Sequence, residues 1–375
     1  MEGESDMPYK KRITKARELL SKLGLKSVVV TYPSNFFYFS GTWIDSHERL
    51  QAIVIPETGE PTMIIHEMSK EEIKIKGLYQ TVFWKDGEKS LEHLLKILPD
   101  RGTVAIDNLW PSQNLIQLMN LNEQLSFVDS TEVIGSLRLY KDKEEIDLLK
   151  KSGAIADKVL NEVIGYIRPG LTEKEVSEEI KRLFALNNVD QLSFKPIIGA
   201  GKNGAIPHHQ SGDNIIKTGD MVVIDMGGVK DHYCSDMTRT VYVGEEPTEE
   251  MKKVYQTVKM AKDEAIKAVK PGVPLKQIDK VARNIISEAG YGDYFTHRTG
   301  HGLGIDVHEE PYVTFNNSQL LEEGMVISIE PGIYLSGNFG VRIEDIVVVT
   351  SDGCERLNNL SCDLICTGKH AQVNR

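Results

Sequence analysis

The chain has 375 residues, of which 40% are hydrophobic and 26% are charged, so it is long enough for two globular domains with sizeable cores. Its formal net charge is −11, from 55 acidic and 44 basic residues, and we expect no nucleic-acid partner. No segment approaches the ~20 apolar residues of a membrane span, so no membrane partner is expected. The polar start MEGESDMPYKKR lacks the apolar core of a signal peptide, and the four cysteines form no C-x-x-C pair. These features predict reduced thiols and a cytoplasmic location.

The N-terminal third, residues 1–135, is predicted to be a compact α/β domain without chemistry of its own. Residues 10–25 are amphipathic with Gly24 near the end, which predicts a helix and its stop signal. Residues 90–99 predict a second helix, closed by Pro99. Short β-branched runs predict four strands, at 26–32, 49–56, 61–67 and 103–108.

The remaining residues, 136–375, are predicted to form an α+β second domain. A charged segment with apolar residues at helical spacing predicts a long helix from about residue 141. Two Pro-Gly turns, at 169–170 and 271–272, each precede a helix, and residues 172–175 have the sequence of a capping box. Each of these units is followed by strands that carry carboxylates, which indicates an internal duplication around a pseudo-two-fold axis.

Two aspartates lie in the stretch VVIDMGGVKDHYCSDMTRT, residues 222–240, which is typical of two strands and a polar turn. If the strands pair as an antiparallel hairpin centred between Lys230 and Asp231, Asp225 faces Asp236 with Cβ atoms about 5 Å apart. Like charges at this distance repel each other, and a bound cation turns the repulsion into a binding site. The alternative is a pair of surface acids on a solvated face.

A second stretch, MVISIEPGIYLSGNFGVRIEDIVVVT at 325–350, repeats this arrangement. A hairpin centred on Gly337 places Glu330 opposite Glu344. Arg342 is two residues before Glu344 and shares its strand face, where it could orient Glu344 or bind a substrate carboxylate. Two such hairpins in one domain bring four carboxylates together, and that arrangement requires counter-charge.

Histidines lie in loops near these hairpins. The segment HRTGHGLGIDVHEEP, residues 297–311, carries His301 between two glycines, which allow close backbone approach, and then His308. An earlier segment, GAIPHHQSG, supplies His208 and His209. A single histidine is more often a packed or solvated residue than a ligand. Two Asp, two Glu and one His, however, form an oxygen-rich set that suits Mn, Co, Fe or Zn, and two ions fit so many bridging oxygens.

In chain order, five residues resemble the metal ligands of the M24 pita-bread metallopeptidases, the family of methionine aminopeptidase, aminopeptidase P and prolidase: Asp225, Asp236, His301, Glu330 and Glu344. The segments DMGGVKDHYCSDMTRT, GHGLGIDVHE, ISIEPGIY and VRIEDIVVVT resemble the family as well. The resemblance covers about residues 139–350, and the N-terminal third more loosely resembles a creatinase-like domain. It implies a pita-bread catalytic domain and two divalent metal ions, Mn or Co, with Zn or Fe as alternatives.

The resemblance also implies how the metals are held and used. Asp225 would bind one ion, His301 and Glu330 the other, and Asp236 and Glu344 would bridge the two. A metal-bridging hydroxide would attack the peptide carbonyl, and Glu330 would carry the proton from the attacking water to the leaving nitrogen.

Further residues take roles from the same resemblance. His208 and His308 resemble histidines that contact the substrate and assist the tetrahedral intermediate, and Arg342 is expected beside them. His209 is expected to lie outside the group of residues that contact the metals or the substrate. His232 stands where relatives often carry glycine.

Within the family, the length and the single N-terminal domain resemble short microbial prolidases. This implies a metallopeptidase that hydrolyses the Xaa-Pro bond of dipeptides and acts as a homodimer on a small peptide substrate. The loop SGTWIDSHERL, residues 40–50, resembles a loop that reaches the partner subunit's active site, where Asp45, His47 and Arg49 could touch the substrate's termini. The same loop could equally be a solvent-exposed one.

Two alternatives stay open. The first is an Xaa-Pro aminopeptidase, aminopeptidase P, which acts on longer peptides and must leave the side beyond the proline open. The second, more remote alternative is a non-catalytic pita-bread binding protein. Such proteins typically lose metal ligands, whereas this chain keeps all five.

Overall fold

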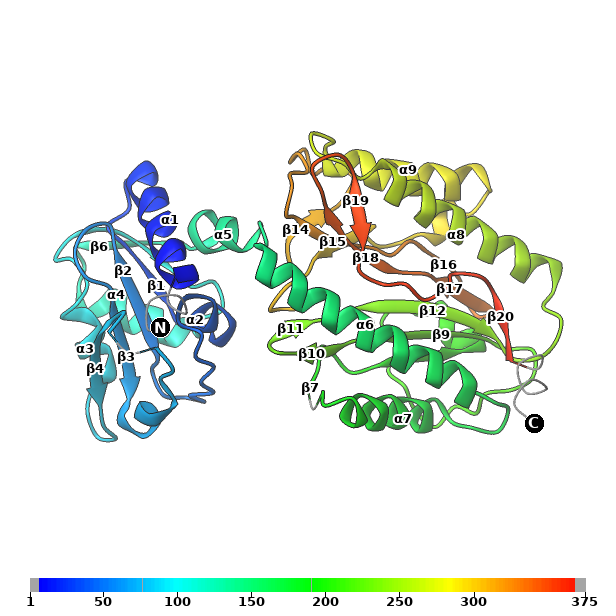
Figure 1. Ribbon diagram of the computed structural model, residues 1–375, viewed down its shortest axis with the longest axis horizontal. Coiled ribbons are helices and arrows are strands. Elements are labelled where there is room, and N and C mark those ends of the chain that lie inside the picture. The colour runs from blue at the N-terminus through cyan, green and yellow to red at the C-terminus, as the bar shows by residue number, and fades with distance from the viewer. Residues whose placement is uncertain (1–6, 76, 190, 368–375) are drawn as a thin grey trace. The chain divides into compact units, whose positions relative to one another are not determined.

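The computed structural model describes residues 7–75, 77–189 and 191–367. The chain divides into two compact units, Met1–Arg138 and Leu139–Arg375 (Figure 1). The first six residues, which begin the polar stretch expected to lack a signal peptide, lie outside the described residues. Within the described ranges, no helix combines the length and the apolar character needed to cross a membrane.

The first unit is built on a mixed six-stranded sheet in the order β4-β3-β2-β1-β5-β6. Its strands are β1 (Ser27–Val30), β2 (Ala52–Pro56), β3 (Thr62–His66), β4 (Gln80–Trp84), β5 (Gly102–Ile106) and β6 (Leu125–Asp129). Its helices are α1 (Met7–Leu23), α2 (Pro33–Ser40), α3 (Ser90–Leu95), α4 (Ser112–Leu121) and α5 (Ser136–Arg138), with the helical turns η1 (Glu67–Glu72) and η2 (Thr131–Gly135).

The four predicted strands and both predicted helices of this unit are present, and Gly24 ends α1 with a left-handed φ of 69°. The strands β4 and β6 and the helices α2 and α4 lie outside the predicted set. Both strands form edges of the sheet and expose several side chains, whereas β1 is buried throughout. An edge strand therefore gives a weaker apolar signal than a central one.

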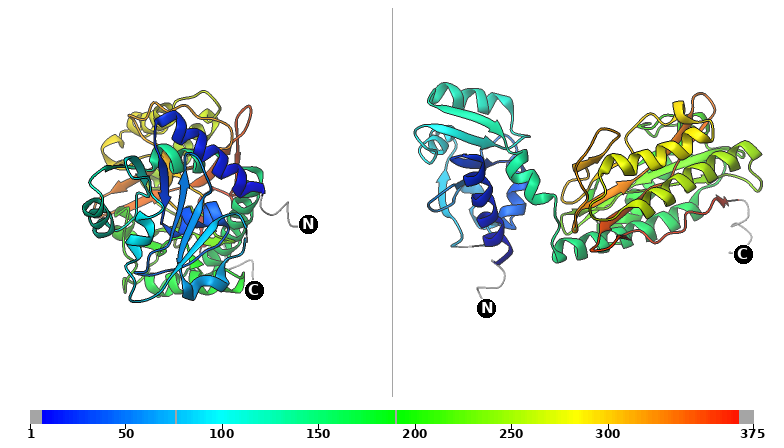
Figure 2. Two further views of the ribbon diagram at one scale, coloured as in Figure 1. Left: turned by 90° about the vertical axis from the view of Figure 1, so that its left-hand side faces the viewer. Right: turned by 90° about the horizontal axis from the view of Figure 1, so that it is seen from above.

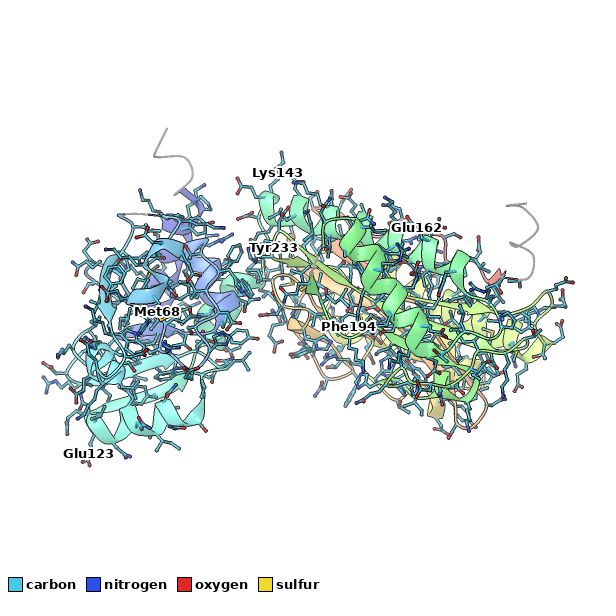
Figure 3. The ribbon with its side chains drawn as sticks, turned by 90° about the horizontal axis from the view of Figure 1, so that it is seen from below. Met68, Glu123, Lys143, Glu162, Phe194 and Tyr233 are labelled. Carbon is cyan, nitrogen blue, oxygen red and sulfur yellow. The ribbon has the colours of Figure 1, made fainter. Side chains whose placement is uncertain are left out.

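The second unit carries four long helices, α6 (Lys143–Tyr166), α7 (Glu173–Leu186), α8 (Glu249–Ala268) and α9 (Leu275–Glu288), and two short turns, η3 (Gly201–Ala205) and η4 (Gly292–Tyr294). Lys143 marks the beginning of α6 in Figure 3, and α8 and α9 lie side by side in Figures 1 and 2. Capping boxes begin α6 at Asp142 and α7 at Thr172, and the predicted box at 172–175 is thereby confirmed. Helix α8 was not predicted.

The strands of the second unit form two main sheets, in the orders β20-β12-β9-β8 and β14-β13-β15-β18-β19. The first contains β8 (Ile197–Ala200), β9 (Met221–Met226), β12 (Met237–Tyr242) and β20 (Ile365–Cys366). The second contains β13 (Gly300–Gly302), β14 (Glu309–Val313), β15 (Val326–Ile329), β18 (Asp345–Val349) and β19 (Cys354–Arg356). Smaller ladders join β7 (Gln191–Leu192), β10 (Gly228–Lys230) and β11 (Tyr233–Cys234), and β16 (Gly332–Leu335) with β17 (Phe339–Arg342).

The second unit is duplicated, as predicted. One apolar core packs α6 and α7 against β8, β9 and β12, and another packs α8 and α9 against β15 to β18. Equivalent hydrogen bonds recur in the two halves, since Gly170 N donates to Ile216 O and Gly272 N donates to Leu321 O. This is the pita-bread architecture, in which the two halves share one site between their sheets.

The predicted register of the second carboxylate hairpin is confirmed. Gly332 pairs with Arg342 in β16–β17, and Ile329 pairs with Asp345 in β15–β18. This register places Glu330 opposite Glu344 at the junction between the two ladders.

The predicted register of the first hairpin is wrong by two residues on the partner strand. Asp225 pairs with Thr238, and not with Asp236. The turn residues are Asp231 and His232, with φ of 50° and 69°, so the turn centre lies one residue later than predicted. Two successive left-handed residues make the two-residue turn that suits the twist of a hairpin, and the left-handed φ at His232 is a conformation that favours glycine.

Candidate active site

The site is a cavity of about 580 Å³ in the second unit. Eight predicted residues line it: His208, Asp225, Asp236, His301, His308, Glu330, Arg342 and Glu344. Apolar walls come from Phe194, Ile197, Pro207 and Val307. Strands and loops of both halves therefore bring these polar side chains to one place, although they are spread over more than a hundred residues of sequence.

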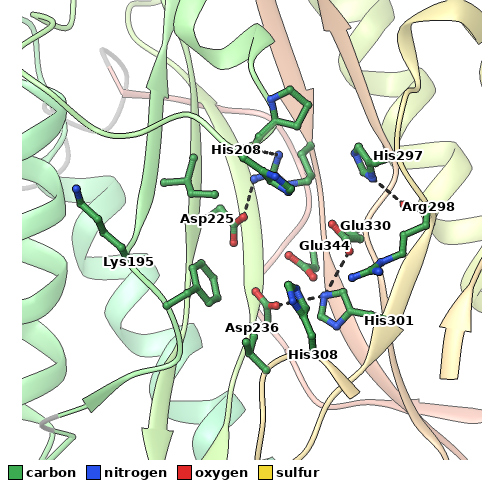
Figure 4. Close-up of a pocket in the computed structure, with 15 residues that line it drawn as sticks. Lys195, His208, Asp225, Asp236, His297, Arg298, His301, His308, Glu330 and Glu344 are labelled. Atoms are coloured by element: carbon green, nitrogen blue, oxygen red, sulfur yellow. Dashed lines mark hydrogen bonds and ion pairs between the residues drawn. The ribbon is translucent and has the colours of Figure 1, made fainter. Parts of the chain in front are cut away.

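Four carboxylates and one imidazole converge in this cavity. Figure 4 shows the side chains that point toward one another: Asp225, Asp236, His301, Glu330 and Glu344. His301 Nε2 lies 3.6 Å from Asp236 Oδ2 and 3.4 Å from Glu330 Oε1. Potential ligand atoms of Asp236, His301 and Glu344 all lie within 4.8 Å of one another, which is close enough for one ion to reach all three.

The protein leaves several of these oxygens without a partner. Among the described residues, no hydrogen bond reaches the buried Asp225 Oδ1, Asp236 Oδ1 or Glu344 Oε1. A buried carboxylate oxygen without a partner is costly, and three in one cavity indicate a ligand that is not protein. The hard oxygen-rich donor set with one imidazole fits divalent ions such as Mn²⁺, Co²⁺, Zn²⁺ or Fe²⁺.

The electrostatics agree with such a ligand. Burial raises the pKa of Glu330 to about 7. Burial and the neighbouring carboxylates raise the pKa values of Asp236 and Glu344 well above the ordinary range of a carboxyl group. Burial also lowers the pKa of His301 to about 3, so its imidazole is neutral and can donate a lone pair to a cation.

Local backbone geometry fixes His301. Its Nδ1 lies 2.9 Å from Gly302 O, which accepts the Nδ1 proton and leaves Nε2 facing the carboxylates. A Cβ at Gly300 would lie 1.9 Å from Ser328 O, and one at Gly302 would lie 2.2 Å from Glu310 O. The glycines on both sides of His301 are therefore needed for the close approach that the sequence indicated.

Arg342 joins the two carboxylate hairpins. Its Nη2 donates to Asp225 Oδ2 at 2.6 Å, and its Nε donates to Thr238 Oγ1 at 3.2 Å. Thr238 Oγ1 in turn donates to Glu344 Oε2 at 2.8 Å. Arg342 thus contacts Asp225 directly and reaches Glu344 only through Thr238.

A second polar chain runs beside the cavity. Arg342 Nη1 donates to Tyr334 Oη at 3.0 Å, and Tyr334 Oη lies 2.8 Å from His297 Nε2. Burial lowers the pKa of His297 to about 3, so its neutral ring accepts from Tyr334 at Nε2 and donates from Nδ1 to Arg298 O at 2.7 Å. These partners of Arg342 were not predicted, because only the fold brings them together.

The histidines outside the carboxylate cluster occupy different places. His208 lines the cavity, and the ring of His308 packs edge-on against His301 with centroids 4.3 Å apart. Burial lowers the pKa of His308. His209 turns away and pairs with Glu173 at 2.7 Å, outside the cavity.

Arg298 is a cavity residue that sequence reasoning missed, although it lies three residues before His301 in a segment already singled out. Its guanidinium carbon lies 4.4 Å from the ring centroid of Tyr312. In the described part of the chain, no carboxylate forms an ion pair with Arg298. It therefore offers a positive charge, supported by an aromatic ring, to whatever enters the cavity (Figure 4).

The predicted loop at 40–50 belongs to the first unit. Asp45 and His47 are exposed, with side chains 74% and 73% accessible. Arg49 donates from Nε and Nη2 to both carboxylate oxygens of Asp86, at 3.1 and 3.0 Å. The role of this loop at a partner's site stays a prediction.

Comparison with known proteins agrees with this geometry. Residues 147–351 match the metallopeptidase family M24, and residues 12–140 match the creatinase/prolidase N-terminal domain. A recombinant prolidase from Thermococcus sibiricus is 40% identical, with 96% of this chain and 99% of that chain covered and a TM-score of 0.91. An X-Pro aminopeptidase from Thermotoga maritima is 30% identical, with 93% and 99% covered and a TM-score of 0.82. An uncharacterized peptidase from Staphylococcus aureus is 39% identical, with 93% of this chain and 99% of the relative covered. The chain therefore belongs to metallopeptidase family M24 and carries the creatinase/prolidase N-terminal domain.

Proposed function

We propose that the protein hydrolyses the Xaa-Pro bond of dipeptides with the help of two divalent metal ions. The observation that carries the hydrolytic part is the set of buried, unpartnered carboxylate oxygens around His301. The likeness to a prolidase over nearly the whole chain supports the choice of substrate class.

Five residues would hold the metals: Asp225, Asp236, His301, Glu330 and Glu344. Mn or Co is our first choice, with Zn or Fe as alternatives, because the same donor set accepts all four. Divalent ions in this place supply Lewis acidity toward a peptide carbonyl and toward water.

The surrounding side chains would act on the substrate. Glu330 lines the cavity next to His301 and would carry the proton to the leaving proline nitrogen. His208 and His308 would donate hydrogen bonds to the oxygen on which negative charge develops, since a neutral imidazole has one N–H. Arg342 would keep Asp225, and through Thr238 also Glu344, in place for the metals.

A dipeptide differs from a longer peptide by the free carboxylate of its proline. Arg298 lines the cavity, stacks on Tyr312 and has no carboxylate partner among the described residues. A guanidinium can hold a carboxylate through two parallel hydrogen bonds. We therefore place the proline carboxylate at Arg298, which supports a dipeptidase. The likeness to an X-Pro aminopeptidase keeps that activity as the second candidate.

We further propose a cytoplasmic homodimer in which Asp45, His47 and Arg49 reach the substrate of the partner subunit. The exposure of Asp45 and His47 supports contact with another molecule. Arg49 would have to leave Asp86 to bind a substrate carboxylate.

The test compares Ala-Pro with its C-terminal amide, which has the same size but no terminal charge. Manganese-loaded wild-type protein and the Arg298→Gln variant would be followed by chromatography. We expect Arg298→Gln to lower kcat/KM for Ala-Pro by about 10–100-fold and to leave the amide nearly unchanged, since a charge-assisted hydrogen bond is lost only with Ala-Pro. Equal losses for both substrates would contradict the role of Arg298, and no cleavage of Ala-Pro by the wild-type protein would contradict the proposed activity.

A further inference from the structure

The buried carboxylate of Glu173, at the start of α7, accepts hydrogen bonds from a loop and does not line the cavity. Glu173 is 0% exposed, and both of its oxygens accept hydrogen bonds. The donors to Oε1 are Ala200 N (3.0 Å), Asn203 Nδ2 (2.9 Å) and Asn214 Nδ2 (3.0 Å), and those to Oε2 are His209 Nε2 (2.7 Å) and Gly212 N (3.3 Å). This many donors offset the cost of burying a charged group.

The internal duplication shows that the fold itself does not need this charge. Glu173 N donates to Asn214 O at 3.0 Å, and Leu275 N donates to Gln319 O at 2.9 Å at the equivalent place in the second half. Leu275 is fully buried in the apolar core of its half. A leucine is therefore sufficient to start the equivalent helix, and the carboxylate of Glu173 serves something particular to the first half.

What distinguishes the first half is the loop that follows β8. All five donors to Glu173 belong to residues 200–214, which carry His208 into the cavity. Pro207 O accepts a hydrogen bond from Arg342 Nη1 at 3.3 Å. His208 thus lies between Pro207, which is held by a cavity residue, and His209, which is held by Glu173.

We propose that Glu173 is a positioning residue for the reaction, and that it acts by fixing the 200–214 loop so that His208 faces the substrate. This inference rests on the proposed function, because it assigns His208 a part in hydrolysis. Positioning matters at this scale, since a misplacement of about 1 Å can cost about 10²-fold in rate.

The test begins with Glu173→Gln. The amide group of glutamine must face donors in either orientation, toward Ala200, Asn203 and Asn214 or toward His209 and Gly212. Each side carries one backbone N–H, of Ala200 or of Gly212, which cannot become an acceptor, so the loop must shift in either orientation. We expect kcat for Ala-Pro to fall about 100-fold while the metal content per chain stays at the wild-type value, as measured by elemental analysis.

Glu175→Gln is the matched control. Glu175 lies in the same turn of α7, is exposed, and forms the capping box with Thr172. It should change the thermal midpoint slightly and leave kcat at the wild-type value. His209→Ala removes a single tie to Glu173 and provides a milder variant if Glu173→Gln folds poorly; it should lower kcat by a smaller factor with unchanged metal content.

A double-mutant cycle separates positioning from general damage. If Glu173 acts through His208, adding Glu173→Gln to His208→Ala should not lower kcat/KM further. The inference is overturned by an equal loss in both backgrounds, or by wild-type kcat in Glu173→Gln and His209→Ala. If the wild-type protein does not cleave Ala-Pro at all, the proposed function is contradicted. If the wild-type protein cleaves Ala-Pro and Glu173→Gln cleaves it equally well, the proposed function stands and only the inference about Glu173 fails.

Discussion

At the scale of single residues, the site is built from groups that are costly unless a cation joins them. Asp225, Asp236 and Glu344 each bury an oxygen without a hydrogen-bond partner in the described part of the chain. A structural role would be served equally well by an amide or an apolar side chain. The carboxylates are therefore explained by metal binding, and the loss of one of them should be felt first in the metal content.

Asp236→Asn tests this account, because asparagine keeps the shape and removes the charge. We expect the variant to bind fewer metal ions than the wild-type protein and to lose at least about 100-fold in kcat. Even mutation of a residue that only hydrogen-bonds to a metal ligand lowers metal affinity or activity by about 10–100-fold. Elemental analysis and Ala-Pro hydrolysis measure the two effects. Asp231→Asn, in the exposed turn of the same hairpin, is the control and should change neither. Wild-type metal content and rate in Asp236→Asn would show that the site is assigned wrongly.

The burial of His297 predicts how the stability of the protein depends on pH. Burial lowers its folded-state pKa to about 3 from an ordinary 6.5. Below pH 6.5 the His297 side chain is protonated in the unfolded chain but stays neutral in the folded chain. The contribution of neutral His297 to the free energy of unfolding is therefore complete above pH 6.5 and is lost as the pH falls toward 3.

His297→Gln should remove that dependence. Glutamine can still accept from Tyr334 and donate to Arg298 O, so the fold should persist. Urea unfolding of metal-free protein between pH 6.5 and 4.5 should show a free energy of unfolding that falls less steeply in the variant, by about 1.4 kcal/mol per pH unit. Parallel curves for the two proteins would mean that His297 is protonated in the folded state.

At the scale of elements, the two hairpins show what local sequence can and cannot specify. The register of 325–350 was predicted correctly because its three-residue turn is centred on Gly337, which has a left-handed φ of 76°. The register of 222–240 was wrong because the left-handed turn residues are Asp231 and His232, and histidine does not signal such a turn. Both carboxylates of that hairpin still reach the cavity.

The missed site residues have a different explanation. The eight predicted residues that line the cavity could be singled out because each lies in a short segment with its own chemical signal. Thr238 and Glu173 were missed because their partners are distant in sequence, such as Arg342 at 104 residues from Thr238 and Asn214 at 41 residues from Glu173. Only the folded arrangement reveals those contacts.

Helix α6 offers an internal comparison of two glycines. A Cβ at Gly153 would lie 2.7 Å from Leu357 O, whereas nothing lies within 4 Å of a Cβ at Gly165. Gly165→Ala should raise the free energy of unfolding by about 0.5–1 kcal/mol, because alanine is the better helix former. Gly153→Ala should lower it by about 1–3 kcal/mol, because the C-terminal segment at Leu357 must move. Chemical unfolding of both variants measures the difference, and equal effects would contradict the close packing of α6 on that segment.

At the scale of the whole molecule, the duplicated second unit and its asymmetric additions define the activity. The shared architecture brings carboxylates from both halves to one cavity. Only the first half adds the loop with His208 and its anchor Glu173, and only the second adds His301, Arg298 and His308. The family membership supports metal-dependent peptide hydrolysis, and under our proposal the polar groups around the carboxylates decide which peptide is accepted.

The most direct test of the central claim is a comparison of Ala-Pro with Ala-Pro-Ala by the manganese-loaded protein. If Arg298 holds the proline carboxylate, kcat/KM for the dipeptide should exceed that for the tripeptide by about tenfold or more. Equal or faster cleavage of the tripeptide would contradict the assignment as a dipeptidase and would identify the protein as an Xaa-Pro aminopeptidase. If neither peptide is cleaved with Mn or Co, the hydrolytic account fails and a non-catalytic binding role remains.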